Sequence, residues 1–466
     1  MNFWKFFVCV GFVATGFAAC SDKDDHQETM EQSEGSHLVK IAAEETQSLE
    51  SLLASDYNAG EQDALPEDLE QMQLNKTDVV NAASRLYKQF GDDNGTFLGK
   101  VEVKTFTLHY TSIDGKGQPI VISGKLTVPM VSGKYVPIED IILHCHPTAL
   151  GNKQQGTSPT TFREMVAYSF AVLDPDYIGI GLTNTQAQTY LCQKLIARNC
   201  VDMVLAALEH FKEEGIELAK GYGTYVVGYS QGGGNAMAVA RHLQETPEGR
   251  EANKLVNIKH LYCGGGPYNP SGTFQHWLQT DSMSMSLVLP LVVKGAQEGH
   301  SDLMSGLSMN SFFSDDYLAT GMVQKIDNVV LDITMFLNDM NLSKIMWPDK
   351  PAAQKTMYEL AQGLPWMQFS KILSAASLDT SSAQRRALEQ CMALERVDDW
   401  TPRFPVEIYT APRDNVIPVG PNAKAVYDKF KAAGADVTYV EAGYDSNHLT
   451  AQVAWVTHVK NLLKQL

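Results

Sequence analysis

The sequence predicts an α/β protein with a mostly parallel β-sheet, helices on both faces of the sheet and one long helical insertion. Two observations lead to this class. From residue 100 onward, short apolar runs typical of strands alternate with stretches of helical period. Between residues 267 and 400 this alternation stops and several helical patterns follow one another. With 466 residues, 44% of them hydrophobic, the chain is long enough to bury a large core.

The first element is a targeting segment, "MNFWKFFVCVGFVATGFAAC". It has one lysine, an apolar stretch and small residues that end at Cys20, and it is too short to span a membrane. The "FAAC" ending resembles a bacterial lipoprotein signal, which implies a signal peptide over residues 1–19 and a lipid on Cys20. The alternative is an ordinary secretory signal cleaved nearby.

Residues 20–72 are predicted to form an acidic tether with some helix. Residues 21–72 contain fifteen acidic and two basic residues, and so carry −13 of the net charge of −17. Because Lys5 is the one charge of the leader, residues 73–466 carry only −5. The sequence contains no basic patch, so we expect no nucleic acid partner.

The sheet is predicted in two parts, at residues 73–266 and 401–466. "VEVKTFTLHYTSID" and "PIVISGKLTVP" alternate apolar with polar residues and indicate an antiparallel pair joined by "GKGQ". Buried strands follow in "IEDIILHCHP", "AYSFAVLDPDYIGIG", "GTYVVGYS", "NIKHLYCGGG", "FPVEIYTAP" and "ADVTYVEAG". Helical patterns lie at residues 191–214, 231–244, 421–433 and 451–465.

Residues 267–400 are predicted to form a helical cap over the carboxyl edge of the sheet. This segment contains eleven of the eighteen methionines. Flexible thioether side chains suit an adaptable apolar pocket, although they serve equally well to pack the cap's own core.

The cysteines do not suggest a disulfide framework. Five remain after the leader and Cys20, an odd and scattered set that is typical of small core residues, although one bridge stays open in an exported protein. Cys192 and Cys200 lie two helical turns apart, about 12 Å along one helix, which is too far for a bond.

The stretch "TYVVGYSQGGGNAMAVA" contains the motif G-x-S-x-G at Gly228–Gly232, between an apolar strand and a helical pattern. A nucleophilic serine on such a strained turn needs small residues two positions away on either side. We therefore expect Ser230 to be a nucleophile, with the backbone N–H of Gln231 directed at a developing oxyanion.

A serine hydroxyl needs a base, and the partners of such a serine follow it in the order acid, then histidine. His448 lies beyond the last predicted strand, "ADVTYVEAG", and just before the terminal helix. Asp414 follows the preceding predicted strand, "FPVEIYTAP". Asp414 would hold the imidazole tautomer and stabilise its charged form. Asp398 and Asp399 precede their strand and fit less well, and Asp445 is expected to lie on a surface loop.

The stretch "LHCHPTALG" is predicted to supply the second oxyanion contact, from the backbone N–H of Thr148. His144 and His146 would face the same side of a continued strand, so a metal pair is the alternative. The sequence shows no third ligand at a recognisable spacing. We therefore expect no metal and no cofactor.

Together, "LHCHPT", "DPDYIGIG", "TYL", "GYSQGGGNAMA", "APRDNVIP" and "NH" resemble the α/β-hydrolase superfamily, and more narrowly its secretory lipase and esterase group, which includes bacterial lipoproteins. Pro147 departs from the glycine usual in that group. The resemblance implies a serine ester hydrolase of a small-molecule or acylated substrate, held at the membrane of the cell envelope by a lipid anchor. A serine peptidase and an inactive surface binding protein are the alternatives.

Overall fold

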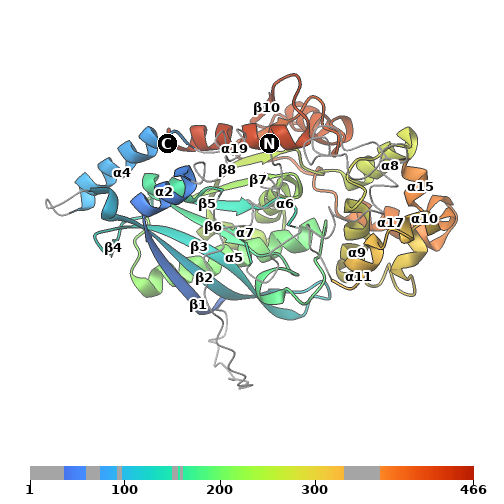
Figure 1. Cartoon of the computed structure of the whole chain (residues 1–466), viewed down its shortest axis with the longest axis horizontal. Coiled ribbons are helices and arrows are strands. Elements are labelled where there is room, and N and C mark those ends of the chain that lie inside the picture. Colours follow the sequence, from blue (N-terminus) through green and yellow to red (C-terminus); the bar gives the residue numbers. More distant parts are fainter. Residues whose placement is uncertain (1–35, 59–73, 92–96, 150–155, 158–160, 330–367) are drawn as a thin grey trace, which may run out of the picture.

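The computed structural model describes residues 36–58, 74–91, 97–149, 156–157, 161–329 and 368–466. At the centre of the described chain is a ten-stranded sheet in the order β1-β2-β3-β6-β5-β7-β8-β9-β10, with β4 paired to β3 (Figure 1). The strands are β1 (Leu38–Ser48), β2 (Val101–Ile113), β3 (Pro119–Val131), β4 (Lys134–Tyr135), β5 (Asp140–Cys145), β6 (Phe170–Pro175), β7 (Thr224–Tyr229), β8 (Ile258–Gly264), β9 (Val406–Thr410) and β10 (Val437–Glu441). The prediction of a mostly parallel α/β sheet is confirmed.

The antiparallel part of the sheet is formed by β1 to β4 and joins the parallel part at β6. β2 and β3 pair from Val101 opposite Val131 to Ile113 opposite Pro119, as the alternating pattern predicts. In the turn between them, the Asp114 carboxylate accepts the backbone N–H groups of Lys116 and Gln118 at 2.8 Å. β3 then pairs antiparallel with β6, which joins this ribbon to the parallel strands.

The parallel part consists of β6, β5, β7, β8, β9 and β10, each pairing parallel with its neighbour. Strands β5, β6 and β7 are buried along their whole length, as expected for strands covered on both faces. Since all six strands run in one direction, the loops that follow them meet at one edge of the sheet.

The prediction of a tether over residues 20–72 is wrong for part of that range. β1 pairs antiparallel with β2, and Leu49, Leu52 and Leu53 at the start of α2 (Leu49–Asn58) are buried in the core. Strand pairing at an edge depends on backbone hydrogen bonds rather than on apolar side chains. The acidic composition of the whole segment therefore hid a strand and the first turn of a helix.

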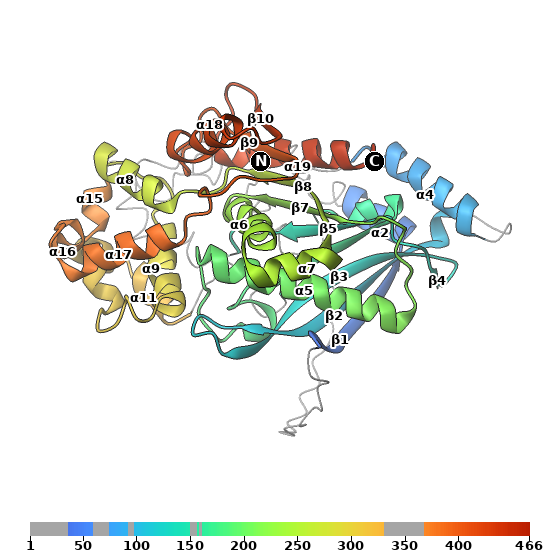
Figure 2. The same cartoon turned by 180° about the vertical axis from the view of Figure 1, so that it is seen from behind.

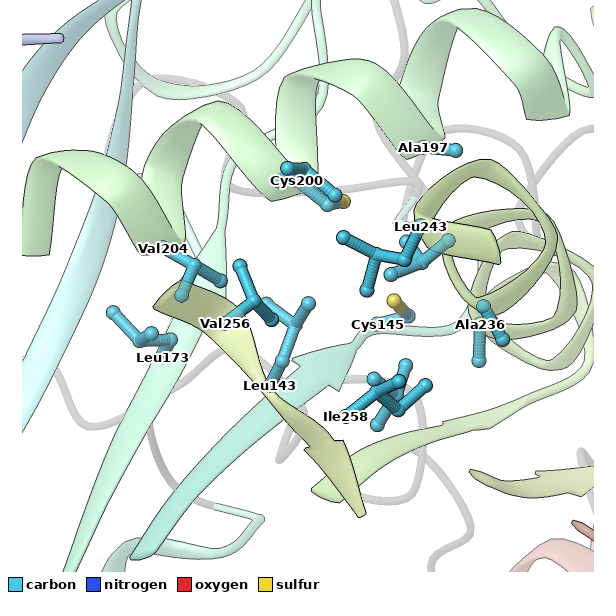
Figure 3. Packing of buried hydrophobic residues seen from close by; sticks show 14 of the residues in the cluster. Leu143, Cys145, Leu173, Ala197, Cys200, Val204, Ala236, Leu243, Val256 and Ile258 are labelled. Carbon is cyan, nitrogen blue, oxygen red and sulfur yellow. The ribbon is translucent and has the colours of Figure 1, made fainter. Parts of the chain in front are cut away.

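Helices cover both faces of the sheet (Figures 1 and 2). One face carries α5 (Gln193–Glu214), α6 (Gln231–Glu245), α7 (Pro247–Val256) and α18 (Ala425–Ala432). The other carries α2, α4 (Lys76–Phe90), the 3₁₀ turn η2 (Arg163–Tyr168) and α19 (His448–Leu463). Figure 3 shows the packing between β5, α5 and α6, where Leu143, Val204, Leu243 and the thiols of Cys145 and Cys200 share one apolar layer.

The described part of residues 267–400 is helical and begins directly after β8. Its longer helices pack around their own apolar cluster, which includes Met283, Phe312 and Phe369 (Figure 1, yellow to orange). The helices are α8 (Pro270–Thr280), α9 (Val288–Gly299), α10 (Asp315–Leu318), α11 (Met322–Asp327), α15 (Phe369–Ile372), α16 (Ala375–Leu378) and α17 (Ala383–Leu394). We call these described parts of residues 267–400 the cap.

The five cysteines of the described chain are all buried and free, as small core residues would be. Cys192 and Cys200 are not bonded to each other. Within the described ranges, no helix combines the length and the apolar character that crossing a membrane requires.

Candidate active site

The turn between β7 and α6 holds Ser230 in a strained conformation. Its φ is 57° and its ψ is −126°, a region that residues with a side chain rarely adopt. A Cβ on Gly228 would lie 2.1 Å from the carbonyl oxygen of Gly232, and a Cβ on Gly232 would lie 2.0 Å from the oxygen of Cys145. Both glycines of the motif are therefore required by close backbone contacts, and the turn raises Ser230 at the carboxyl edge of the sheet.

Backbone hydrogen bonds hold the serine turn. The N–H of Ser230 donates to the carbonyl of Gly264 at the end of β8, at 2.9 Å. The carbonyl of Ser230 accepts from Gly233 and Gly234, which starts the hydrogen-bond ladder of α6. The strain at Ser230 is thus offset by contacts to the neighbouring strand and helix.

The structure brings the predicted serine and histidine together across 218 residues of sequence. His448 Nε2 lies 2.8 Å from Ser230 Oγ. His448 is 2% exposed and is the first residue of α19, which Asn447 caps through its side chain. The sequence placed His448 just before this helix, so the helix begins one turn earlier than predicted. The N-terminal capping contact of Asn447 fixes the position from which the imidazole of His448 projects.

Asp414 completes a chain of three hydrogen-bonded side chains. Its Oδ2 lies 2.8 Å from His448 Nδ1, and its Oδ1 accepts the backbone N–H groups of Val416 and Ile417 at 2.9 and 2.7 Å. A carboxylate only accepts hydrogen bonds, so the proton of the neutral imidazole is on Nδ1. Nε2 is then free to accept the hydroxyl proton of Ser230.

The other acids that the sequence offered bind elsewhere. Asp398 pairs with Arg396 at 2.9 Å, and Asp399 pairs with Arg241 at 2.8 Å. Asp445 is exposed and lies 3.1 Å from Arg413. The structure therefore places Asp414, and none of these three, against the histidine.

Tyr229 is a site residue that the sequence reasoning missed. Its hydroxyl donates to the carbonyl oxygen of His448 at 2.8 Å, and the two rings lie 5.3 Å apart. The ring of Trp455 also lies near the Tyr229 ring, with the two centroids 5.6 Å apart. Most buried tyrosine hydroxyls have a hydrogen-bond partner, and the place of Tyr229 beside Ser230 in the motif was the available signal.

The segment after β5 lies against the serine turn and is held by several contacts. Tyr177 donates its hydroxyl to the carbonyl of His146 at 3.0 Å and stacks on the His146 ring at 3.9 Å. His146 Nδ1 lies 2.7 Å from the carbonyl of Pro147, and Thr148 Oγ1 lies 2.9 Å from the hydroxyl of Tyr190. Burial lowers the pKa of His146 to about 4, so this ring is neutral.

One of the two predicted oxyanion residues lies in the serine turn, and the other lies in the segment after β5 that packs against this turn. Gln231 is buried at the first position of α6, and Thr148 is half-buried in the segment after β5. The amino end of a helix favours negative charge, which agrees with the role expected of the Gln231 amide. The joint use of both amides remains a prediction.

His144 does not share a partner with His146. Its Nδ1 lies 2.7 Å from Asp174 Oδ1, and both side chains are buried. Burial raises the pKa of Asp174, and the hydrogen bond from His144 opposes that effect. Among the described residues, the one cluster with a metal-binding composition does not contain either histidine. Cys20 lies outside the described residues.

No protein-family model matches the sequence, and no curated protein matches it. Several solved structures match the fold. The esterase LipA of Xanthomonas oryzae, which degrades rice cell walls, is 19% identical with a TM-score of 0.60, over 82% of this chain and 94% of LipA. A Legionella pneumophila protein designated as a hydrolase is 15% identical with a TM-score of 0.58, over 83% and 94%. Candida antarctica lipase A is 15% identical with a TM-score of 0.50, over 75% and 74%. The chain has the α/β-hydrolase fold, as its motifs predicted.

Proposed function

We propose that the protein is a serine ester hydrolase of the lipase and esterase type. The observation that carries this proposal is the chain Ser230–His448–Asp414, with both hydrogen bonds at 2.8 Å and the serine on a strained turn. The order of these residues in the sequence is the order found in α/β-hydrolases. The likeness to esterase and lipase structures supports the same class of reaction.

The reaction proceeds in two steps of acyl transfer. His448 Nε2 removes the proton of Ser230 as Oγ attacks the ester carbonyl, and Asp414 stabilises the imidazolium that forms. The imidazolium returns the proton to the departing alcohol, which leaves an acyl-enzyme on Ser230. A water molecule activated by the same histidine then releases the acid and restores the serine.

The backbone N–H groups of Gln231 and Thr148 are the proposed donors to the oxyanion. Such donors stabilise negative charge that develops only in the transition state, and one of them contributes about a hundredfold to a thousandfold in turnover. Neither step requires a metal or a cofactor.

The proposed substrate is a small-molecule ester or an acylated larger molecule. The described cap begins directly after β8, and Ser284 in the cap donates a hydrogen bond to the carbonyl of Asn415, next to Asp414. The cap is thus in contact with the loop that carries the acid. We therefore propose that the cap selects the acyl chain, with Met285, beside this contact and half-buried, as one position to vary.

Two measurements on one preparation test the proposal. A panel of aryl esters from acetyl to palmitoyl gives the acyl preference, and a fluorophosphonate probe followed by peptide mass spectrometry identifies the nucleophile. We expect ester turnover and covalent labelling of Ser230, both absent in Ser230→Ala. Cleavage of peptides without ester turnover would indicate the peptidase alternative, and a folded protein that neither reacts nor is labelled would indicate an inactive binding protein.

We further propose that the protein is an exported bacterial lipoprotein of the cell envelope, anchored to the membrane through Cys20. The support is the sequence of the leader, which ends in "FAAC". Detergent phase partitioning tests the anchor. The wild-type protein is expected in the detergent phase and Cys20→Ala in the aqueous phase, whereas equal partitioning of the two would mean that Cys20 is not the anchor.

A further inference from the structure

Three side chains with metal-binding atoms meet where the cap joins the core. Cys192 precedes α5, His300 follows α9, and Glu395 follows α17. Their ligand atoms all lie within 4.8 Å of one another, and no other such group of three occurs within the described ranges. Cys192 and Glu395 are 2% and 5% exposed, while His300 is half-buried. The site shares no residue with the chain of Ser230, His448 and Asp414.

Two glycines on one side of α9 make this approach close. A Cβ on Gly299 would lie 2.4 Å from Cys192 Sγ, and a Cβ on Gly295 would lie 2.1 Å from the carbonyl oxygen of Tyr190. The thiol lies 3.1 Å from the carbonyl oxygen of Gly295, to which it donates. The backbone of α9 therefore lies directly on the segment before α5, and His300 reaches the same place from the end of that helix.

The surroundings of the thiol are acidic. The carboxylates of Glu395 and Glu298 both act electrostatically on the buried thiol. Glu395 Oε1 lies 2.8 Å from His300 Nε2, and Glu395 Oε2 accepts the backbone N–H of Lys194 at 3.0 Å. A divalent cation at this point would reverse the unfavourable charge balance and allow the thiol to ionise.

We propose that Cys192, His300 and Glu395 bind one divalent cation of the zinc class, which fastens the cap to the core. Thiolate, imidazole and carboxylate are the three ligand types of protein zinc sites, and a thiolate disfavours magnesium and calcium. The thiolate and the carboxylate balance the double charge of the ion, and the proton of the thiol is released to solvent. A water molecule would complete a tetrahedral set of ligands.

The required rearrangement is small. Ligand atoms of one tetrahedral zinc ion lie about 3.3–3.7 Å apart, given the usual bond lengths. The contact between His300 and Glu395, now 2.8 Å, therefore opens by about 0.5 Å, and the widest separation in the cluster, at most 4.8 Å, closes by about 1.5 Å or less. The hydrogen bond from Lys194 to Glu395 orients the carboxylate from outside the site, as such contacts do in known metal centres. The sequence predicted no metal, because no third ligand lies at a recognisable spacing from His144 and His146.

Cobalt provides a direct spectroscopic test. The purified full-length protein, kept reduced and freed of metal with a chelator, is titrated with Co²⁺ alone and then with Zn²⁺ as competitor. We expect one ion per chain, a thiolate-to-cobalt charge-transfer band, visible bands of a tetrahedral ion, and loss of both on adding Zn²⁺. Zn²⁺ should also raise the thermal midpoint of unfolding.

Variants decide whether these three residues form the site. Cys192→Ala should remove the charge-transfer band, whereas Cys391→Ala, which removes another buried thiol of the cap, should keep it. His300→Asn, at the more exposed ligand, and Glu395→Gln should each weaken Co²⁺ binding at least about tenfold. Absence of Co²⁺ binding, or a spectrum that Cys192→Ala leaves unchanged, would overturn the proposal and leave a hydrogen-bonded contact between cap and core. Ester turnover is not a readout here, so the result is independent of the proposed function.

Discussion

Two buried histidine–aspartate pairs lie in this fold, and they differ in what surrounds them. His448 and Asp414 are 2.8 Å apart, and the free carboxylate oxygen of Asp414 accepts two backbone N–H groups. His144 and Asp174 are 2.7 Å apart, but the second oxygen of Asp174 has no hydrogen-bond partner among the described residues. His448 contacts Ser230 on its other nitrogen, whereas the ring of His144 lies against Phe162 at 5.0 Å.

The difference indicates which of the two histidine–aspartate pairs suits the proposed catalysis. A carboxylate held by backbone amides remains suited to carry charge in a buried place, and burial without such contacts raises the pKa, as for Asp174. In the proposed mechanism, the first pair is the one suited to stabilise an imidazolium beside Ser230. The second pair, His144 and Asp174, links the adjacent strands β5 and β6 through a side-chain hydrogen bond.

The largest loss of turnover should come from removing the Ser230 hydroxyl or the His448 imidazole. We expect Ser230→Ala and His448→Ala each to lower turnover of an aryl ester at least about a thousandfold, because the residual rate comes only from binding and the oxyanion donors. Initial rates and thermal midpoints would be measured together. Ser381→Ala, an exposed serine of the cap, serves as control. Ester hydrolysis that persists in folded Ser230→Ala would contradict the mechanism.

The second prediction sets the two aspartates against each other. Asp414→Asn should lower turnover about a hundredfold or more, because an amide can donate to Nδ1 and so favour the wrong tautomer of His448. Asp174→Asn should change turnover by less than about tenfold, since its histidine touches no reacting atom. A larger loss from Asp174→Asn than from Asp414→Asn would reverse the assignment of the two pairs.

The third prediction concerns pH, through His146 next to the second pair. Its pKa falls from 6.5 to about 4 on burial, so between these values the unfolded chain binds more protons than the folded protein. The stability present above pH 6.5 is therefore lost as the pH falls through this window, by about 3 kcal/mol for a group shifted this far.

Urea unfolding of wild type and His146→Gln at several pH values in this window would measure that loss. The variant should lose less stability on acidification, with a part remaining because burial also lowers the pKa of His242 to about 4. His276→Gln, at an exposed histidine of the cap, provides the matched comparison. Equal pH dependence in wild type and His146→Gln would show that the pKa of His146 does not differ between the folded and unfolded states.

A smaller effect is expected when the second pair loses its acid altogether. Asp174→Ala leaves the buried His144 without its partner and should lower the free energy of unfolding by about 1–3 kcal/mol. Denaturant unfolding at neutral pH would measure it, and catalytic turnover per folded molecule should stay within about tenfold. An unchanged free energy of unfolding would mean that the pair does not stabilise the sheet.

The smallest effect should come from Tyr229. Tyr229→Phe removes the hydrogen bond to the His448 carbonyl but keeps the ring, which should cost about 0.5–1.5 kcal/mol of stability and a few-fold in turnover. Turnover and thermal midpoint would be followed in parallel. A loss as large as that of Asp414→Asn would mean that Tyr229 holds the histidine as firmly as the acid does.

Much of the fold and the three bonded side chains could be predicted because each carries a local signature. The glycines around Ser230 are required by backbone contacts of about 2 Å, and such a requirement leaves a pattern in neighbouring residues. His448 and Asp414 follow strands whose apolar runs were clear. Their order along the chain then made the choice among several aspartates.

Other features could not be predicted, because their partners lie far away in the sequence. β1 is stabilised by backbone pairing with β2, which its acidic composition does not reveal. Cys192, His300 and Glu395 have no common motif, since three separate helix ends bring them together. Tyr229 carried a signal in the motif, but the carbonyl that it binds became visible only in the folded chain.

The position of β1 also limits how far the folded body could lie from the proposed lipid anchor. If the tether ran from Cys20 to residue 72, as the sequence predicted, the folded body could lie up to about 175 Å from its anchor at full extension of the chain. The strand β1 and the contacts of Ser36 and His37 with Glu209 instead show that residues 36–48 belong to the folded body. For an anchor at Cys20, the body then stays within about 55 Å of the lipid surface. Under the proposed anchor and activity, the esters within reach would be those that come to the membrane or are displayed close to it.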